Sequence, residues 1–209
     1  PFSQLEGVVA KRIASKLDPT EADSEYFASR RPSFAGRGRL TPAQRGTATH
    51  RFMQYADYSR ACKSVADELT RLTEDGMLTA EEANAVDARA VARFFDNGLY
   101  ARMSRAERIY KEYSFTCSVP VSELYPQLPC GLADGEVVLI EGVADCAFVE
   151  GGELVVVDYK TDKASSAAEL AERYGAQLGI YRRCLAEVLG MPVKETVIYS
   201  FRLNESITL

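Results

Sequence analysis

The sequence predicts an α/β domain in which a mostly helical N-terminal half is followed by a mixed sheet flanked by helices. Helix-start signals and helical spacing fill residues 41–98. Strand-like runs follow between residues 111 and 161, and a long amphipathic segment separates them from a last strand-like run. Strands, a helix and a strand in that order favour a sheet with both parallel and antiparallel neighbours.

The helical half carries two start signals. Thr41 before Pro42 is typical of an N-cap residue followed by proline at the first helical position, and helical spacing continues over residues 41–72. Thr79, with a glutamate three residues later, matches a capping box. We expect the helix that begins there to end at Gly98.

The second half has the shorter period of strands. Strand-like runs occur at residues 111–121, 136–150 and 153–161. Gly151-Gly152, between the last two, is typical of a tight hairpin turn. We expect an amphipathic helix over residues 165–190, ended by Gly190, and a closing strand over residues 193–201.

Length and composition bound the organisation of the chain. Its 209 residues, 46% of them hydrophobic, suffice for one sizeable domain with an appended arm. We expect residues 1–39 to form a polar arm or linker and residues 40–209 to form the domain. No apolar run reaches the roughly 18 residues of a membrane span, so the expected location is the cytoplasm. Because the chain begins with Pro1 rather than methionine, we expect a piece of a longer chain.

Cysteine usage and net charge exclude some classes of protein. The five cysteines include no C-x-x-C pair, which argues against a disulfide framework, a zinc site or an iron-sulfur cluster and favours free thiols. The net charge of −5 does not indicate a nucleic-acid binder. It does not exclude one, because carboxylates around a metal are locally acidic and a basic surface can be confined to one groove.

The hairpin places charged residues together. If the two glycines form the turn, facing residues have numbers that add to 303, so Asp145 faces Asp158 and Val143 faces Lys160. Side chains alternate between the faces of a strand, which puts Asp145, Asp158 and Lys160 on one face. Directly opposed Cβ atoms lie about 4.5–5.5 Å apart. Two carboxylates at that separation either share a proton or hold a cation.

A divalent cation is the simpler of these outcomes. Mg²⁺ or Mn²⁺ prefers oxygen ligands and commonly uses one or two carboxylates together with water and a substrate phosphate. Lys160 on the same face can then orient a water or stabilise charge in a transition state. The alternative is that Asp158 and Lys160 are solvated at a strand end and that the register is shifted by one residue, which would move Asp145 to the other face.

An ordered set of acidic residues resembles the PD-(D/E)xK nuclease superfamily. The matching residues are Glu112, Asp145 in GVADCAF, and Asp158-Tyr159-Lys160 in VVVDYKTD. The resemblance covers the chain from about Leu40 to its C-terminus. It implies a restriction-endonuclease-like fold, a mixed sheet flanked by helices.

Two further motifs resemble the RecB-like branch of this superfamily. Gly46 and His50 in RGTATHRF are similar to its G-x-x-x-H element, and Gln177 and Tyr181 in YGAQLGIY are similar to its Q-x-x-x-Y helix motif. The run DYKTD and the tail IYSF resemble most closely the C-terminal nuclease domains of the AddA-type subunits of AddAB and RecBCD-type helicase-nucleases.

The resemblance implies a role for each matching residue. The metal ligands would be His50, Asp145, Asp158, the backbone carbonyl of Tyr159 and, with less support from the pattern, Glu112. Lys160 would assist the attacking water, and the carboxylates would act with it in catalysis. Gln177 and Tyr181 are four residues apart on one helix face and would hold Lys160, the substrate backbone or each other.

The function implied is a Mg²⁺-dependent DNA nuclease domain, with Mn²⁺ as a substitute, that hydrolyses unwound strands during double-strand break repair by recombination. The implied partners are single-stranded DNA, helicase domains of the same full-length chain and an AddB-type subunit, without a membrane. No G-x-x-x-x-G-K-[ST] occurs, so this chain is not the motor. AddB and Cas4-like relatives carry a four-cysteine iron-sulfur cluster, which these cysteine positions do not supply.

Two alternatives remain open. One is a non-catalytic nuclease-fold module that channels DNA or provides a docking surface in a larger assembly. The other is a stand-alone repair exonuclease of the same superfamily.

Overall fold

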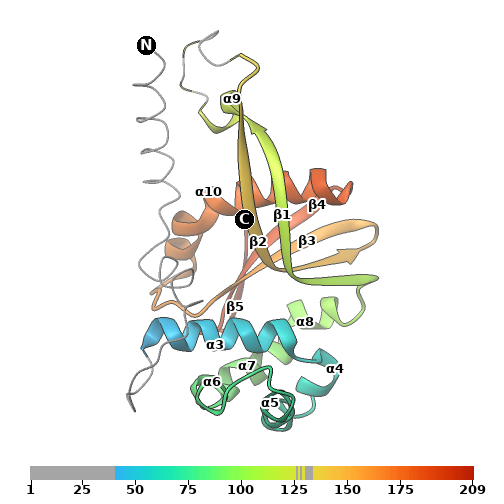
Figure 1. The fold of residues 1–209 in the computed structure, drawn as a ribbon, viewed down its shortest axis with the longest axis vertical. Coiled ribbons are helices and arrows are strands. Elements are labelled where there is room, and N and C mark those ends of the chain that lie inside the picture. The colour runs from blue at the N-terminus through green and yellow to red at the C-terminus, as the bar shows by residue number, and fades with distance from the viewer. Residues whose placement is uncertain (1–40, 126, 128, 130–133) are drawn as a thin grey trace.

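The computed structural model describes residues 41–125, 127, 129 and 134–209, and the arm expected at residues 1–39 lies outside this part (Figure 1). Within it, a helical layer precedes the sheet. Its helices are α3 (Pro42–Tyr55), α4 (Tyr58–Ala61), α5 (Val65–Glu74), α6 (Ala80–Ala85), α7 (Ala88–Phe95) and α8 (Gly98–Met103). None of the helices in the described residues is long and apolar enough to cross a membrane.

The sheet has the strand order β1-β2-β3-β4-β5. Its strands are β1 (Arg108–Pro120), β2 (Val137–Glu150), β3 (Glu153–Lys160), β4 (Val193–Ser200) and β5 (Glu205–Thr208). All neighbours are antiparallel except β3 and β4, which are parallel and joined by the crossover helix α10 (Ala167–Leu189). The outer part of the β1–β2 hairpin, with α9 (Val121–Leu124) near its tip, extends beyond the rest of the sheet (Figure 1).

Helices cover both faces of the sheet, as the valine-rich β3 requires. On one face, side chains of β2, β3 and β4 pack against α3, α5, α7 and α8 around the fully buried Phe52 and Phe94. On the other face, two clusters lie under α10, one centred on Leu154 and Leu185 and one on Leu170 and Ile198. The predicted fold class, a mixed sheet flanked by helices with a helical N-terminal half, is confirmed.

The two predicted helix starts are confirmed, but the predicted lengths were wrong. Thr41 and Thr79 each form a capping box. The segment after Thr79 does not run to a stop at Gly98, because Asp87 accepts the N–H groups of Arg89 and Ala90 and starts α7. Asn97 then caps α8, so Gly98 is the first residue of that helix. Short side chains that can cap a helix divide this half into short helices.

The predicted hairpin register is confirmed over five pairs. They run from Cys146–Val157 to Glu150–Glu153, and in each pair the numbers add to 303. Gly151 and Gly152 have φ values of 64° and 79°, the left-handed conformation that a two-residue hairpin turn uses and that glycine adopts without strain. The pairing expected between Val143 and Lys160 does not form, because the β2–β3 ladder ends at Cys146–Val157 and Val143 pairs with β1.

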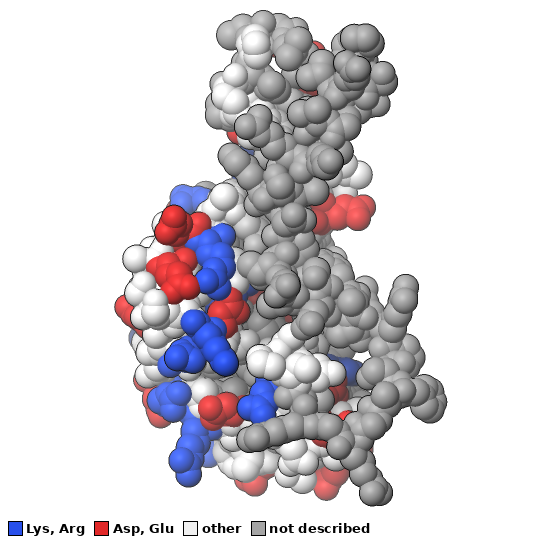
Figure 2. All heavy atoms as spheres, turned by 90° about the vertical axis from the view of Figure 1, so that its left-hand side faces the viewer, with Lys and Arg blue, Asp and Glu red and all other residues white. Residues whose placement is uncertain are grey.

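Charges of both signs are interspersed on the surface seen in Figure 2, which faces left in Figure 1. On the described residues of this face, lysine and arginine side chains lie beside aspartate and glutamate side chains. The net charge of the chain is −5. Attraction of a phosphate backbone to this surface would therefore come from individual side chains rather than from a broad positive field.

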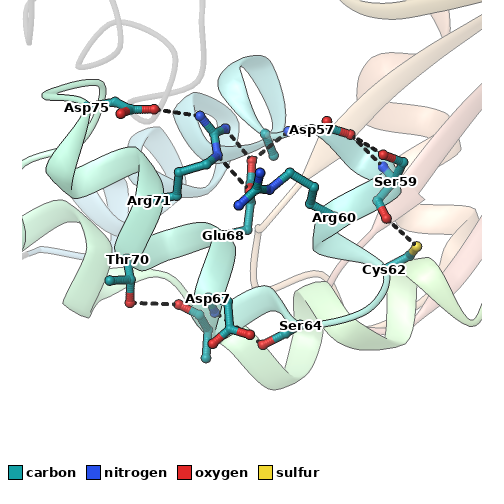
Figure 3. Close-up of polar contacts among 12 residues, drawn as sticks. Asp57, Ser59, Arg60, Cys62, Ser64, Asp67, Glu68, Thr70, Arg71 and Asp75 are labelled. Atoms are coloured by element: carbon teal, nitrogen blue, oxygen red, sulfur yellow. Dashed lines mark hydrogen bonds and ion pairs between the residues drawn. The ribbon is translucent and has the colours of Figure 1, made fainter.

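A buried ion cluster links the helices of the N-terminal half (Figure 3). Glu68 in α5 is 1% exposed. Its carboxylate accepts hydrogen bonds from Arg71 at 2.5 and 2.9 Å and from the N–H of Asp57 at 2.7 Å, and Arg60 lies 3.4 Å away. Burial raises the pKa of Glu68, but the hydrogen bonds from Arg71 and Asp57 outweigh it, so the pKa is lowered overall. This carboxylate holds α4 against α5.

The expected free thiols are found at each cysteine in the described residues. Cys62 is exposed, whereas Cys117, Cys146 and Cys184 are buried. Cys130 lies outside the described part.

Candidate metal centre

Three neighbouring strands bring carboxylates to one place in the sheet. The β1–β2 register pairs the residues on either side of Glu112 with those on either side of Asp145, so these two lie opposite each other. The β2–β3 register ends with the pair Cys146–Val157, one step before Asp145 and Asp158. The central strand β2 therefore carries Asp145 between Glu112 of β1 and Asp158 of β3.

Glu112 has an unusual backbone conformation. Its φ of 47° lies in the left-handed region, which costs a residue with a side chain about 1–3 kcal/mol. The regular β1–β2 pairing is interrupted at this residue. One ligand atom each from His50, Glu112 and Asp145 lies within 4.8 Å of the others, and among the described residues these three could hold a metal ion. The strained backbone thus coincides with a candidate ligand.

His50 reaches this cluster from helix α3. Its Nδ1 lies 3.3 Å from Oδ1 of Asp145, and its ring meets the Tyr159 ring edge-on at 6.4 Å. Burial lowers the pKa of His50, but the charge and hydrogen bond of Asp145 outweigh it, so the pKa is raised overall. Burial acts on Asp145 in the opposite sense, and the charge and hydrogen bond of His50 lower its pKa overall. Without a metal, the two groups form a partly buried ion pair.

Gly46 lets α3 approach the end of β3. A Cβ at this position would lie 2.8 Å from Oγ1 of Thr161, the residue after Lys160. Gly46 and His50 are one helical turn apart and share a face of α3. The G-x-x-x-H spacing therefore combines a close backbone approach with a histidine that extends to Asp145.

The second oxygen of Asp145 fixes β3. Oδ2 accepts a hydrogen bond of 2.8 Å from the N–H of Tyr159. This contact takes the place of regular pairing beyond Cys146–Val157. The Tyr159 side chain points to the helical layer, where its hydroxyl lies 3.2 Å from that of Tyr58. The predicted role of the Tyr159 carbonyl as a ligand stays a prediction.

Asp158 and Lys160 form a buried pair at the end of β3. Each residue is 8% exposed, so the alternative of a solvated strand end is wrong. The Lys160 ammonium lies 3.0 Å from Oδ2 of Asp158, but this oxygen is buried and receives no hydrogen bond of good geometry from the described residues. Burial raises the pKa of Asp158 to about 6, against the lowering effect of Lys160. The counter-charge of Asp158 in this structure is thus Lys160, whereas the sequence predicted a cation shared with Asp145.

Helix α10 carries the Q-x-x-x-Y pair. Nε2 of Gln177 donates to the Tyr181 hydroxyl at 3.4 Å, so these residues contact each other, one of the three predicted arrangements. The Tyr181 ring packs edge-on against Phe115 of β1 at 5.0 Å. The Phe115 ring in turn lies over Gly142, where a Cβ would be only 2.5 Å away. Tyr181 therefore anchors α10 on the β1–β2 hairpin.

The sequence analysis missed Tyr174. Its ring lies under the Lys160 ammonium, 4.1 Å from the nitrogen, and its hydroxyl donates to Asp162. The signal was available, because Tyr174 lies three residues before Gln177 and seven before Tyr181 and so shares their helix face.

The donor set fits a divalent cation. Carboxylate oxygens suit hard ions such as Mg²⁺ and Mn²⁺, and imidazole suits transition metals, so His50, Glu112 and Asp145 offer ligands for either. The buried Oδ2 of Asp158, which receives no hydrogen bond from the described residues, is an additional oxygen whose environment favours a positive charge nearby.

The fold and this cluster define a class of enzyme-like domains, and comparison with known families agrees. The profile of the PD-(D/E)XK nuclease superfamily matches residues 24–207. The chain belongs to this superfamily.

Known relatives narrow the class. The chain is 36% identical over 182 residues to an ATP-dependent helicase/nuclease subunit of Geobacillus thermodenitrificans (strain NG80-2), covering 82% of the chain and 14% of the relative. It is 35% identical over 199 residues to the protein of the same name in Geobacillus kaustophilus (strain HTA426), covering 90% and 16%. For the protein of that name in Syntrophomonas wolfei subsp. wolfei (strain DSM 2245B / Goettingen), the values are 30% over 222 residues, 99% and 18%.

These relatives confirm the resemblance to the nuclease domain of helicase-nuclease subunits. The chain spans less than a fifth of the length of each of these three relatives. It therefore corresponds to the nuclease module of such subunits.

Proposed function

We propose that this chain is a catalytic nuclease module that hydrolyses phosphodiester bonds in DNA, with Mg²⁺ as its metal and Mn²⁺ as a substitute. The observation that carries the proposal is the meeting of three carboxylates from three neighbouring strands with one histidine and one lysine. A structural role does not require this combination, because it includes a strained backbone at Glu112 and a buried, incompletely paired carboxylate at Asp158.

The metal would be held by His50, Glu112, Asp145 and Asp158, with the Tyr159 carbonyl as a further ligand. Such an ion supplies a lowered pKa for water and stabilisation of negative charge on the phosphate. The carboxylates would also stop repelling one another in its presence, because the cation would neutralise their charge.

The chain's own residues account for orientation and charge. Asp145 uses one oxygen to hold the N–H of Tyr159 and the other to hold His50, which fixes the first metal ligands relative to β3. Lys160 is already desolvated beside Asp158, so its ammonium is available to orient the attacking water and to stabilise the charge that develops on the phosphate oxygens. In hydrolysis, water adds to phosphorus while the bond to the leaving oxygen breaks.

The relatives' name connects this module with an ATP-dependent helicase. We therefore propose that the substrate is single-stranded DNA produced by unwinding, that the helicase belongs to the same full-length chain, and that an AddB-type subunit completes the assembly. Double-strand break repair by recombination is the corresponding cellular role.

The test is cleavage of end-labelled single-stranded and double-stranded DNA by the 209-residue chain, followed on a denaturing gel with Mg²⁺, with Mn²⁺ and with EDTA. The proposal predicts degradation of single strands that EDTA and the substitution Asp158→Ala both abolish. Circular dichroism of Asp158→Ala checks that the variant is folded. A folded variant that degrades DNA at the wild-type rate would contradict the proposal.

A non-catalytic module is the rival function. It predicts DNA binding without cleavage under all metal conditions, with binding unaffected by Asp158→Ala. Fluorescence anisotropy of a labelled oligonucleotide, measured on the same samples, separates this outcome from simple loss of DNA binding.

A further inference from the structure

Tyr174 is the residue that contacts the Lys160 ammonium from the side of α10. The nitrogen lies 4.1 Å from the centre of the Tyr174 ring, and the tyrosine is 3% exposed. Attraction between a cation and the face of an aromatic ring is stronger when both groups are removed from water. Lys160 therefore lies between the carboxylate of Asp158 and the ring of Tyr174 and is attracted to both.

The Tyr174 ring is itself fixed at both ends. Its body packs in the cluster formed with Leu170, Leu178 and Ile198. Its hydroxyl donates to Oδ2 of Asp162, and burial, followed by this hydrogen bond, raises the pKa of Tyr174 to about 12. The phenol is therefore neutral at physiological pH and donates its proton to a carboxylate only two residues beyond Lys160.

Asp162 ties the segment after β3 to α10. Besides the Tyr174 hydroxyl it accepts a hydrogen bond of 3.2 Å from Arg173, which also binds Glu169 one turn earlier on the helix. The lysine, the segment that follows it and the aromatic ring are thus connected as one unit. A leucine would fill the same apolar space, but it would offer no π face to the ammonium.

We propose that Tyr174 is a positioning residue for Lys160: its ring holds the ammonium beside Asp158, and its hydroxyl, through Asp162, keeps the ring in place. This inference rests on the proposed nuclease function, because Lys160 is the group through which Tyr174 acts on the reaction. It assigns a role to a residue outside the G-x-x-x-H, acidic and Q-x-x-x-Y motifs.

Two substitutions separate the ring from its hydroxyl. Tyr174→Phe keeps the π face and removes the hydrogen bond to Asp162, whereas Tyr174→Leu keeps an apolar side chain and removes the π face. Matched controls are Tyr199→Phe and Tyr199→Leu. Tyr199 is fully buried in β4, and its hydroxyl bonds Asn204 on the sheet face that packs against the helical layer.

The kinetic experiment measures kcat and KM for Mg²⁺-dependent cleavage of a single-stranded oligonucleotide. Tyr174→Leu should lower kcat about tenfold with little change in KM, and Tyr174→Phe should lower it by about threefold or less. The Tyr199 variants should lower the melting temperature as much as their Tyr174 counterparts and keep kcat. Equal effects on kcat of Tyr174→Leu and Tyr199→Leu would overturn the proposal, because they would show only a general loss of packing.

A second readout needs neither metal nor cleavage. In EDTA, with ¹³Cε-labelled lysine, the Lys160 Cε–H signal should carry a ring-current shift that Tyr174→Phe retains and Tyr174→Leu removes. Lys111, whose ammonium lies 3.5 Å from the centre of the Tyr58 ring, gives an internal reference that should not change. A Lys160 signal that is the same in wild type and Tyr174→Leu would overturn the proposal.

The two readouts keep the two proposals apart. If the wild-type chain cleaves no DNA under any metal condition, the proposed function fails, and the lysine signal alone decides whether Tyr174 positions Lys160.

Discussion

Two buried carboxylates, Glu68 in the helical layer and Asp158 in the sheet, differ in how far their charge is satisfied. Glu68 is surrounded by two arginines and a backbone N–H, and these lower its pKa. Asp158 has the Lys160 ammonium beside it, but one of its oxygens is buried without a hydrogen bond from the described residues, and burial raises its pKa to about 6. The carboxylate in the helical layer is electrostatically satisfied, whereas the one in the sheet is not.

The difference identifies which carboxylate serves the fold and which serves a ligand. Buried polar groups in folded proteins are nearly always hydrogen-bonded, so an exception calls for a reason. At Asp158 the reason is its neighbours, since Asp145 and Glu112 lie on the two adjacent strands and His50 completes the group. A divalent cation at this place would supply the positive charge that Glu68 receives from arginines.

The largest effect is expected from Asp158→Asn. The amide cannot provide a charged ligand, so Mg²⁺-dependent cleavage should fall at least about 100-fold. Gel analysis of single-stranded DNA degradation measures this loss. Because the carboxylate is poorly satisfied in the metal-free fold, the melting temperature in EDTA should fall less than in Glu68→Gln; a larger fall would mean that Asp158 is the structural member of the pair.

Glu68→Gln should give the opposite result. It leaves two arginines without their shared carboxylate, and the expected loss of folding free energy is about 2–3 kcal/mol. This is less than for a fully buried pair because Arg71 is 28% exposed. Urea denaturation measures the loss, and cleavage assayed well below the melting temperature should stay within about threefold of wild type. Activity lost in parallel with that of Asp158→Asn would refute the division of roles.

The stability that Glu68 contributes should depend on pH. Its pKa is lowered from 4.5 in the folded state, so its contribution is complete above pH 4.5 and disappears as the pH falls through the lower folded value. The difference in melting temperature between wild type and Glu68→Gln should therefore be constant from about pH 6 to 8 and shrink below pH 4.5. Glu81→Gln, at an exposed position of α6, is the control that should show no such difference. A constant difference down to about pH 3 would contradict the assignment.

The smallest effect is expected from Gly46→Ala. The added Cβ would lie 2.8 Å from Oγ1 of Thr161, which must shift beside Lys160, so cleavage should fall about threefold to tenfold. Gly46→Ala/Thr161→Ala should recover most of the activity because the contact is removed.

Gly179→Ala in α10 is a matched control, since its Cβ would meet nothing within 4 Å. It should keep full activity and gain up to about 1 kcal/mol of stability from helix propensity, as measured by thermal melting. Failure of the double substitution to recover activity would show that Gly46 acts by other means.

The sequence predicted the sheet better than the helical layer. Alternation along the strands and the Gly151-Gly152 turn determine the hairpin register, because a slip of one residue would exchange its two faces. In the helical half, Asp57, Ser64 and Asp87 each start a new helix by accepting backbone N–H groups. Such capping competes with continuation at margins too small for pattern reasoning to decide.

Within the site, the sequence predicted which residues meet but not how they pair. The family motifs identified His50, Asp145 and Asp158, and the structure places His50 beside Asp145 and Asp158 on the adjacent strand. The motifs could not show that Asp145 would bond the backbone of Tyr159, or that Lys160 would lie between Asp158 and Tyr174. These contacts depend on where β2 and β3 separate and on how α10 crosses the sheet, and neither is encoded in local spacing.

Direct titration of Mn²⁺ into the metal-free chain by isothermal calorimetry tests the central claim, that the incompletely satisfied carboxylates form a divalent-cation site. Wild type and Glu68→Gln should bind the ion with similar affinity, and Glu112→Gln/Asp145→Asn should bind it at least about 100-fold more weakly. Undiminished binding by the folded double variant, or loss of binding in folded Glu68→Gln, would contradict the account.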